Sequence, residues 1–467
     1  MTAAPGLEQA YRYLGESCAT VGEGGAALAL ATSGGVEVLD GEVAPAAHPF
    51  FFAGFVSPAD VFAQALLLVA QVARTRFYKP PGMVGAMLAA ADPVVTVTPG
   101  RVRFESFSAC CGVAARLDLL PEAFDAQRAG AGTTNVDLNP PARALLAQVG
   151  AGAPLRLQVG AEELSLATMG AALVERKVPL ATRWVRGFGE AQAQAARMSP
   201  LFAMSPAEAR AFVRALPRAS ATKAVSWAVP STRGFRLAPE PRTGPAACLA
   251  GPERLRFMEP LLRHGIGLRV YGAGQTEPGA SAWELGLPGM RLTATLSPDK
   301  SRGFSGEGGL LGDLAHPGAI GDADLVAALL AYEPAIDLAA LSAAAGWPCD
   351  AQRTGRALNV LAAAGRIGYD LADQAYYHRE LPYDAALPGA LAPRLDGARA
   401  LAAGGAVTWA DPAHATVAGQ GGVYLVALGA DLSEATCTCP WYGRHHGARG
   451  PCKHVLAATL ARPGAAA

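Results

Sequence analysis

The residues best suited to chemistry lie near the C-terminus. Cys437 and Cys439 are followed, after a gap of twelve residues, by Cys452 and His454. Thiolates and imidazoles are ligands that zinc prefers, and four of them complete its tetrahedral shell. Pro440 favours the bend that brings the first two sulfurs together, and the second pair opens a predicted helix whose N-terminus favours a thiolate. Four protein ligands leave no open position, so we expect Zn2+ to be structural rather than catalytic.

Two further imidazoles lie inside the loop between the cysteine pairs. His445 and His446 are therefore alternative ligands for the fourth position. His454 is favoured over them because it stands next but one to Cys452 at the start of the predicted helix.

The pattern C-x-C, a loop and C-x-H, preceded by a β-hairpin that includes Val423-Tyr424-Leu425-Val426, resembles the SWIM zinc finger family. The whole chain is also similar to long bacterial SWIM-finger proteins, through runs such as RFESFSACCG, GTTNVDLNPP and GYDLADQAYYHRELP. SWIM fingers occur in helicase-like ATPases, transposases and signalling proteins. The resemblance therefore implies binding to nucleic acid or to protein, and it does not choose between them.

The predicted finger also carries groups suited to nucleic acid. From Cys437 to the end there are four basic residues and no acidic residue, a formal charge of +4. Basic side chains beside aromatic faces suit contact with a phosphate backbone or with unpaired bases. The candidates are Trp441, Tyr442, Arg444, Arg449 and Lys453. The competing interpretation is that the aromatic rings pack on the zinc site and the arginines are solvated.

Residues 322–380 predict a winged-helix-like module. Helices are expected over 322–332, from Asp337 and from Asp350, and two short strands follow them. The third helix offers residue types that read bases or phosphates, namely Gln352, Arg353, Arg356 and Asn359. However, this stretch contains four Arg against eight acidic residues, so its charge of −4 favours a role without DNA.

The 467 residues predict several domains, at roughly 100–200 residues each. We expect an α+β, multidomain protein. Its predicted parts are a mixed α+β N-terminal domain at 1–204, a strand-rich middle domain at 205–320, a winged-helix-like domain at 321–385 and a ββα SWIM finger at 395–467. Residues 94–107 and 281–296 each predict a β-hairpin that turns at a Pro-Gly pair.

Composition excludes several classes of protein. The formal net charge is zero, so the chain as a whole lacks the basic character of a nucleic-acid coat protein. The N-terminus lacks a signal-peptide pattern, and no apolar run is long enough for a membrane helix, so we expect no membrane partner. The five cysteines outside the motif are scattered, as in reduced cytoplasmic proteins. No Walker A motif is present, so we expect no nucleotide.

No catalytic constellation is recognisable, which favours a protein that is not an enzyme without excluding an enzyme in the N-terminal region. The leading hypothesis is a zinc protein whose structural finger binds nucleic acid or a partner. The alternative is an interaction scaffold that uses the winged helix and the finger to dock protein subunits. Salt dependence separates the two, because phosphate contacts weaken steeply with salt and an apolar interface does not.

Overall fold

The architecture is taken from a computed structural model. It describes residues 17–22, 25–29, 36–39, 42–45, 52–78, 93–135, 138, 140–159, 164–167, 174–175, 180, 182–219, 225–241, 244–273, 278–381, 392–429, 431–432 and 434–463. Below, the body means the described residues up to 381, and the C-terminal segment means residues 392–463. In the described ranges, every helix falls short of the length and apolar character that crossing a bilayer needs.

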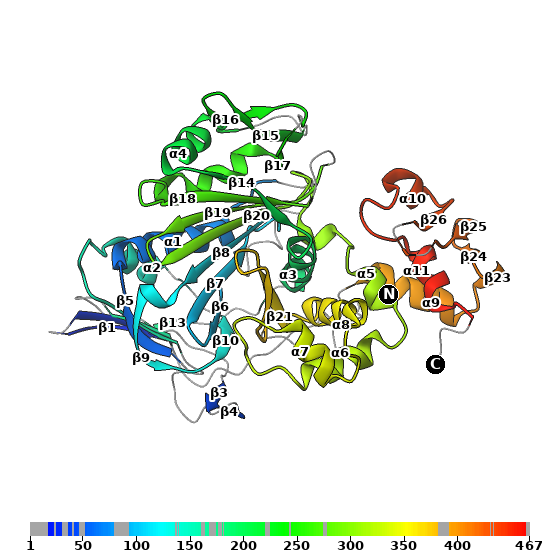
Figure 1. Ribbon diagram of the computed structural model, residues 1–467, viewed down its shortest axis with the longest axis horizontal. Helices are drawn as coiled ribbons and strands as arrows, with labels where there is room; N and C mark the ends of the chain where they lie inside the picture. Colours follow the sequence, from blue (N-terminus) through cyan, green and yellow to red (C-terminus); the bar gives the residue numbers. More distant parts are fainter. Residues whose placement is uncertain are drawn as a thin grey trace.

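The centre of the body is an antiparallel sheet of eight strands in the order β10-β6-β7-β8-β20-β19-β18-β14 (Figure 1). In that order the strands are Gly132–Asn135, Val94–Thr98, Arg101–Phe107, Val113–Leu119, Met290–Leu296, Ser281–Leu287, Gly267–Gly272 and Ser199–Met204. β8 and β20 pair at its middle, where Ala115 lies opposite Ala294. The predicted domain division at residue 205 therefore passes through one continuous sheet.

The two predicted Pro-Gly hairpins are confirmed as β6–β7 and β19–β20. Gly100 and Gly289 occupy the turns with φ of 72° and 65°. Glycine suits both turns because this left-handed backbone conformation is strained for residues with a Cβ atom.

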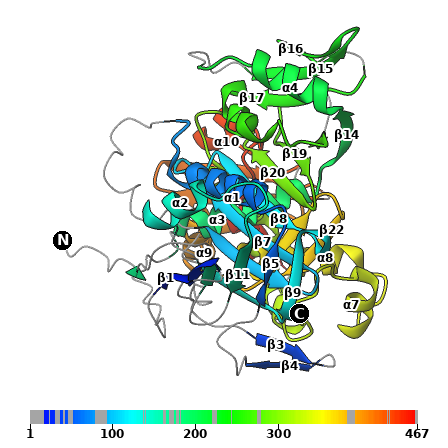
Figure 2. The ribbon, with the colours of Figure 1, turned by 90° about the vertical axis from the view of Figure 1, so that its left-hand side faces the viewer.

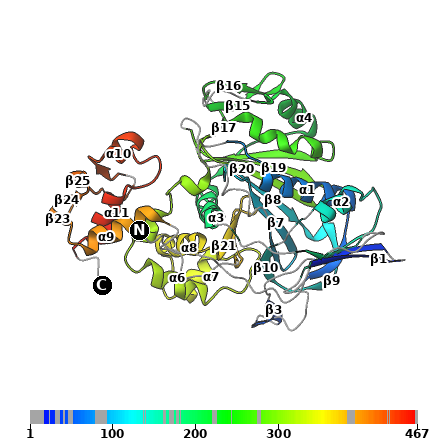
Figure 3. The same ribbon diagram turned by 180° about the vertical axis from the view of Figure 1, so that it is seen from behind.

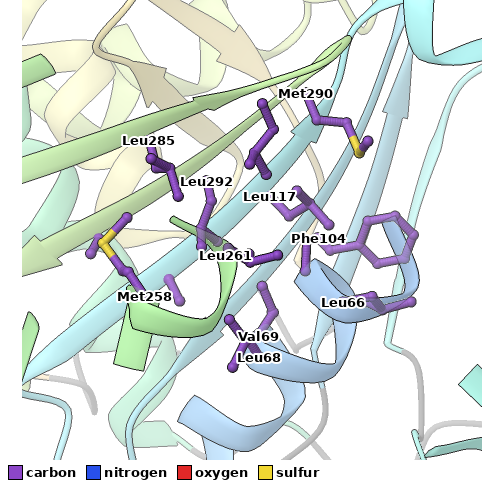
Figure 4. Packing of buried hydrophobic residues seen from close by; sticks show 14 of the residues in the cluster. Leu66, Leu68, Val69, Phe104, Leu117, Met258, Leu261, Leu285, Met290 and Leu292 are labelled. Carbon is purple, nitrogen blue, oxygen red and sulfur yellow. The ribbon is translucent and has the colours of Figure 1, made fainter. Parts of the chain in front are cut away.

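One face of the sheet carries the main hydrophobic core. Helix α1 (Ala59–Arg74) lies across it, with Phe62 against Phe104 at a ring-centroid distance of 5.7 Å. The Ser106 hydroxyl donates a hydrogen bond of 2.7 Å to the Val69 carbonyl and so satisfies a polar group within this core. Figure 4 shows leucines, methionines and Val69 from α1, the sheet and the 3-10 helix η2 (Pro252–Leu261) converging on this core.

The opposite face of the same sheet is charged. Along β7, side chains alternate between faces, so Arg103 and Glu105 lie on the side away from α1. Arg103 is fully buried and donates at 2.9 Å both to Asp118 and to Asp370. Asp370 belongs to the hairpin β21–β22 (Ile367–Asp370 and Ala375–His378), whose Tyr377 lies 3.7 Å from the Arg103 guanidinium. Buried ion pairs therefore fix this hairpin to the sheet.

Smaller sheets surround this centre. A sheet of seven strands has the order β13-β1-β2-β12-β11-β5-β9. Its strands are Val174–Glu175, Ser17–Gly22, Gly25–Ala29, Leu164–Ala167, Leu155–Val159, Phe52–Val56 and Phe124–Ala129. Further elements are β3 (Val36–Leu39), β4 (Glu42–Pro45), α2 (Pro140–Ala147) and η1 (Pro121–Ala123). Figure 2 shows the β3–β4 hairpin away from the main sheet.

A three-stranded sheet, β16-β15-β17, stands on another side of the body. Its strands are Gly234–Ala238, Val225–Ser231 and Ala247–Ala250. Helix α4 (Pro206–Ala215) packs against this sheet and begins with a capping box. In the capping box, the Glu208 backbone N–H donates to the Ser205 hydroxyl, and the Ser205 N–H donates to the Glu208 carboxylate.

A group of helices lies beside the large sheet (Figure 1). It consists of α3 (Thr182–Ala195), η3 (Phe304–Gly306), α5 (Leu311–Ala315), α6 (Ala319–Ala327), α7 (Leu338–Ala344) and α8 (Ala351–Ala363). Asp337 and Asp350 cap α7 and α8 through their carboxylates, as the sequence predicts. Three helices and a hairpin thus follow one another in the predicted order, and the winged-helix assignment itself stays a prediction.

The C-terminal segment lies at one end of the molecule (Figure 3). Helix α9 (Pro393–Ala403) precedes a four-stranded sheet of β23 (Val407–Asp411), β24 (His414–Gly419), β25 (Gly422–Ala427) and β26 (Thr436–Cys437). Two helices follow, α10 (Pro440–His445) and α11 (Lys453–Leu460), and α11 packs on α9. Helices, several sheets and this terminal unit confirm the predicted α+β fold class.

Candidate zinc site and its surroundings

The structure brings the four predicted ligand residues together. Cys437 ends β26, Cys439 is the N-cap of α10, Cys452 is the N-cap of α11, and His454 lies in the first turn of α11. One ligand atom from each lies within 4.8 Å of every other, and all four side chains are buried. Zinc–sulfur bonds of about 2.3 Å would place tetrahedral ligands about 3.8 Å apart, so shifts of about 1 Å would close the shell.

Local backbone geometry makes two of these sulfurs good zinc ligands. The Tyr442 N–H donates to Cys439 Sγ at 3.4 Å, and the Val455 N–H donates to Cys452 Sγ at 3.5 Å. Each sulfur therefore stands at the positive end of a helix, which stabilises the thiolate that zinc binds. A hydrogen bond from Cys437, with further bonds from His454 and Val455, lowers the pKa of Cys452.

The imidazole of His454 is held in one orientation. Its ring lies against the Tyr424 ring with centroids 4.4 Å apart, and its Nδ1 is 3.9 Å from Cys437 Sγ. Its Nε2 is buried and has no hydrogen-bond partner among the described residues. A Cβ at Gly419 would stand 3.1 Å from Nε2, so glycine leaves the ring its space. This geometry places Nδ1, rather than Nε2, next to Cys437 Sγ.

The alternative histidines lie outside this cluster of described residues. The His445 ring is 4.8 Å from the Trp441 ring, and the His446 ring is 6.0 Å from the Tyr442 ring. Each packs beside an aromatic residue of α10.

The side chains predicted to contact nucleic acid are in different environments. Trp441 is half-buried, with the Arg394 guanidinium 4.8 Å from its ring centroid. Arg449 donates to the Gly306 carbonyl of the body, while Tyr442 and Lys453 are half-buried. Arg444 alone of the five is exposed. The nucleic-acid role of these residues stays a prediction.

Arg394 was not identified from the sequence, although it joins the C-terminal segment to the body. It donates to the carbonyls of Arg449 and Pro451 at 2.7 and 3.2 Å and to that of Glu307 at 2.8 Å. The chain passes Arg394 closely at Gly308, where a Cβ would stand 2.1 Å from its Nη2. The glycine-rich run at 303–313 therefore forms part of the surface of the body that contacts the C-terminal segment.

Two of the four polar residues on α8 are engaged within the protein. Arg353 donates to both carboxylate oxygens of Asp322, at 2.9 and 2.7 Å, and its guanidinium lies 4.1 Å from the Trp347 ring centroid. Asn359 donates to Asp313 at 2.7 Å. These contacts hold α8 to its neighbouring helices, and they compete with any contact to bases.

Comparison with known proteins supports the site. Residues 424–463 match the SWIM zinc finger family. No curated protein matches the chain significantly.

Similar solved structures include proliferating cellular nuclear antigen from Entamoeba histolytica, at 9% identity over 53% of this chain and 98% of that chain, with a TM-score of 0.33. Another is A. fulgidus proliferating cellular nuclear antigen bound to the C-terminal region of FEN-1, at 11% identity over 53% of this chain and 97% of that chain, with a TM-score of 0.34. Likeness at this level supports no conclusion about this chain. The family match and the cluster of three thiols and an imidazole agree, and residues 424–463 are a zinc-binding SWIM finger.

Proposed function

We propose that this chain is a zinc-stabilised scaffold that docks a partner protein through the outer face of its C-terminal sheet. The observation that carries the proposal is the exposure of Val423 and Leu425, at 67% and 62%, on β25. Two large apolar side chains exposed side by side on one strand are typical of a protein contact surface. We call this face the β25 face.

Cross-strand pairing defines the chemistry of the β25 face. Ala418 lies opposite Val423, Thr416 lies opposite Leu425, and Thr408 lies opposite Thr416 on the next strand. The middle of the face is therefore neutral, with methyl and hydroxyl groups between the two apolar side chains. Such a face complements an apolar surface of a partner protein and offers no cation to a phosphate backbone.

The basic groups of the finger favour the same proposal. Arg449 donates to the body, and Trp441 stacks with Arg394, so neither projects as a free contact. Arg444 and Arg462 are the exposed arginines of the described finger. Two exposed arginines give a small phosphate footprint compared with the six to ten contacts, roughly, that produce a steep salt dependence.

A capture experiment with matched variants tests the proposal. Zinc-loaded wild type, a Val423→Ser/Leu425→Ser variant and an Arg444→Ala/Arg462→Ala variant are immobilised and exposed to extract from the source organism. The captured proteins are quantified at low salt and at about 0.5 M salt, at which surface charges are well screened. We expect a partner that wild type and the arginine variant retain at high salt and that the serine variant loses.

The rival function, nucleic-acid binding, predicts another pattern. Labelled single- and double-stranded DNA and RNA are titrated with the same three proteins and followed by fluorescence anisotropy. The rival function would be supported by micromolar binding that falls steeply with salt and is lost in the arginine variant. If, in addition, the serine variant captured the same proteins as wild type, the scaffold proposal would be replaced by nucleic-acid binding.

A further inference from the structure

A cavity of about 270 Å³ lies where the C-terminal segment meets the body. Its wall comes from segments that are far apart in the chain: α3, the loop before α5, α5 itself, α9 and the zinc finger. Its main side chains are Arg186, Glu190, Leu310, Leu314, Trp441 and Arg449. The volume is close to the lower end of ligand pockets, about 300 Å³, and so suits a molecule with a single ring.

Part of the hydrogen-bonding capacity of the cavity arginines is unused, although Arg394 and Arg449 each donate to backbone carbonyls. Among the described residues, the Arg186 side chain makes no hydrogen bond or ion pair, although it is half-buried. Arg449 has a buried Nε with no hydrogen-bond partner. Burial and then the nearby Arg449 charge lower the pKa of Arg394 to about 10. Three guanidinium groups thus share a desolvated space, an arrangement that an anion would stabilise.

Among the described residues, the two carboxyl groups that line the cavity form no ion pair with its arginines. Glu307 forms an ion pair with Arg302, which does not line the cavity. Glu190 accepts backbone N–H bonds from Gly309 at 2.9 Å and from Leu310 at 3.5 Å, and it forms no ion pair within the described part of the chain. The Glu190 carboxylate favours the charged form of Arg186, but burial raises the pKa of Glu190 to about 7, so this carboxyl group offsets the arginine charge only in part at neutral pH.

We propose that this cavity binds a small organic anion, with its carboxylate or phosphate group at Arg186 and Arg449 and its apolar body against Leu310, Leu314 and Trp441. Guanidinium groups are the usual protein partners of both oxyanions, because they offer paired N–H donors. The apolar wall distinguishes the ligand from a bare ion. Nothing in the scaffold proposal requires this ligand, so the two proposals stand separately.

Zinc is part of this site, although it lies outside the cavity. Trp441 and Arg449 both belong to the loop between Cys439 and Cys452, so the metal fixes the part of the wall that they form. The proposal therefore includes zinc-dependent binding of the anion, in which removal of the metal opens one side of the cavity.

Isothermal titration calorimetry of the zinc-loaded full chain tests the site with four probes. Phenyl phosphate and benzoate carry both an oxyanion and a ring, benzyl alcohol carries only the ring, and inorganic phosphate carries only the anion. We expect one or both ring anions to bind at least about tenfold more tightly than the two partial probes. A comparison of the affinities of phenyl phosphate and benzoate shows whether the site prefers phosphate or carboxylate.

Variants separate a specific site from general ion binding. Arg186→Gln should weaken the ring anions about tenfold and keep the wild-type melting temperature, because Arg186 bonds to no described residue. Arg197→Gln, at an exposed position just beyond α3, is the matched control and should bind as wild type. Chelation of zinc should abolish binding. Equal affinity in Arg186→Gln and wild type, or no preference for ring anions over the partial probes, would overturn the proposal.

Discussion

The hairpin β21–β22 should depend on a single carboxylate. Asp370 is fully buried and lies 2.9 Å from Arg101 and Arg103, 3.1 Å from Arg291 and 3.3 Å from Arg116. Burial raises the pKa of Asp370, but the Arg116, Arg103 and Arg291 guanidiniums outweigh it and hold the pKa well below the usual range. We predict that Asp370→Asn, which keeps the shape and removes the charge, destabilises the protein by about 3–5 kcal/mol.

The magnitude follows from what remains after the substitution. Arg103 would keep Asp118 as its ion-pair partner at 2.9 Å, while Arg101 and Arg291 would keep only Asp373. Removing one partner from a buried ion pair leaves an uncompensated buried charge, and this explains the large cost. Asp373→Asn is the matched control, because its side chain is 32% exposed and its loss should cost about 1 kcal/mol or less.

Urea unfolding followed by circular dichroism measures both variants, and hydrogen exchange of residues 367–378 reports on the hairpin itself. We expect Asp370→Asn to lower the free energy of unfolding and to speed exchange in the hairpin, with little change in Asp373→Asn. Equal small losses in both variants, with wild-type exchange in the hairpin, would refute the idea that the buried charges hold it to the sheet.

Two further predictions concern the contact between the body and the C-terminal segment. Burial raises the pKa of Glu190 from 4.5 to about 7, so its stabilising contribution is complete below about 4.5 and is lost as pH rises through 7. Wild type should therefore lose stability relative to Glu190→Gln between pH 5 and pH 8, and parallel melting curves would contradict this. A Cβ at Gly450 would stand 1.9 Å from the Gly308 carbonyl oxygen, so Gly450→Ala should displace the C-terminal segment and speed exchange at 303–310. Gly447→Ala has a similar φ, 79° against 74°, with no atom within 4 Å of its Cβ, and should leave that exchange unchanged.

The zinc site was predictable because its signal is local. The cluster is specified within eighteen residues by a C-x-C pair, a proline, and a C-x-H pair at the start of a helix. The structure brings Cys437, Cys439, Cys452 and His454 together. Hairpins with Pro-Gly turns and helices capped by Asp337 and Asp350 were predictable for the same reason. Each depends on neighbours that the sequence itself places side by side.

Contacts between distant segments could not be predicted in this way. Arg103 and Asp370 are 267 positions apart, and nothing in either neighbourhood indicates a buried partner. The same holds for Arg394, whose carbonyl partners include Glu307, 87 positions away. The pairing of β8 with β20 likewise joins the two predicted domains at 1–204 and 205–320. The alternation of apolar residues along each strand does not specify which distant strand it pairs with.

The most direct test of the zinc finger is the metal content of the purified chain. Zinc is measured by inductively coupled plasma mass spectrometry in wild type, in Cys452→Ser and in His445→Ala as a control within the loop. We predict one zinc per chain in wild type and in His445→Ala, and loss of zinc with unfolding confined to the C-terminal segment in Cys452→Ser. Full retention of one zinc per chain in Cys452→Ser would contradict the assignment of these four ligands.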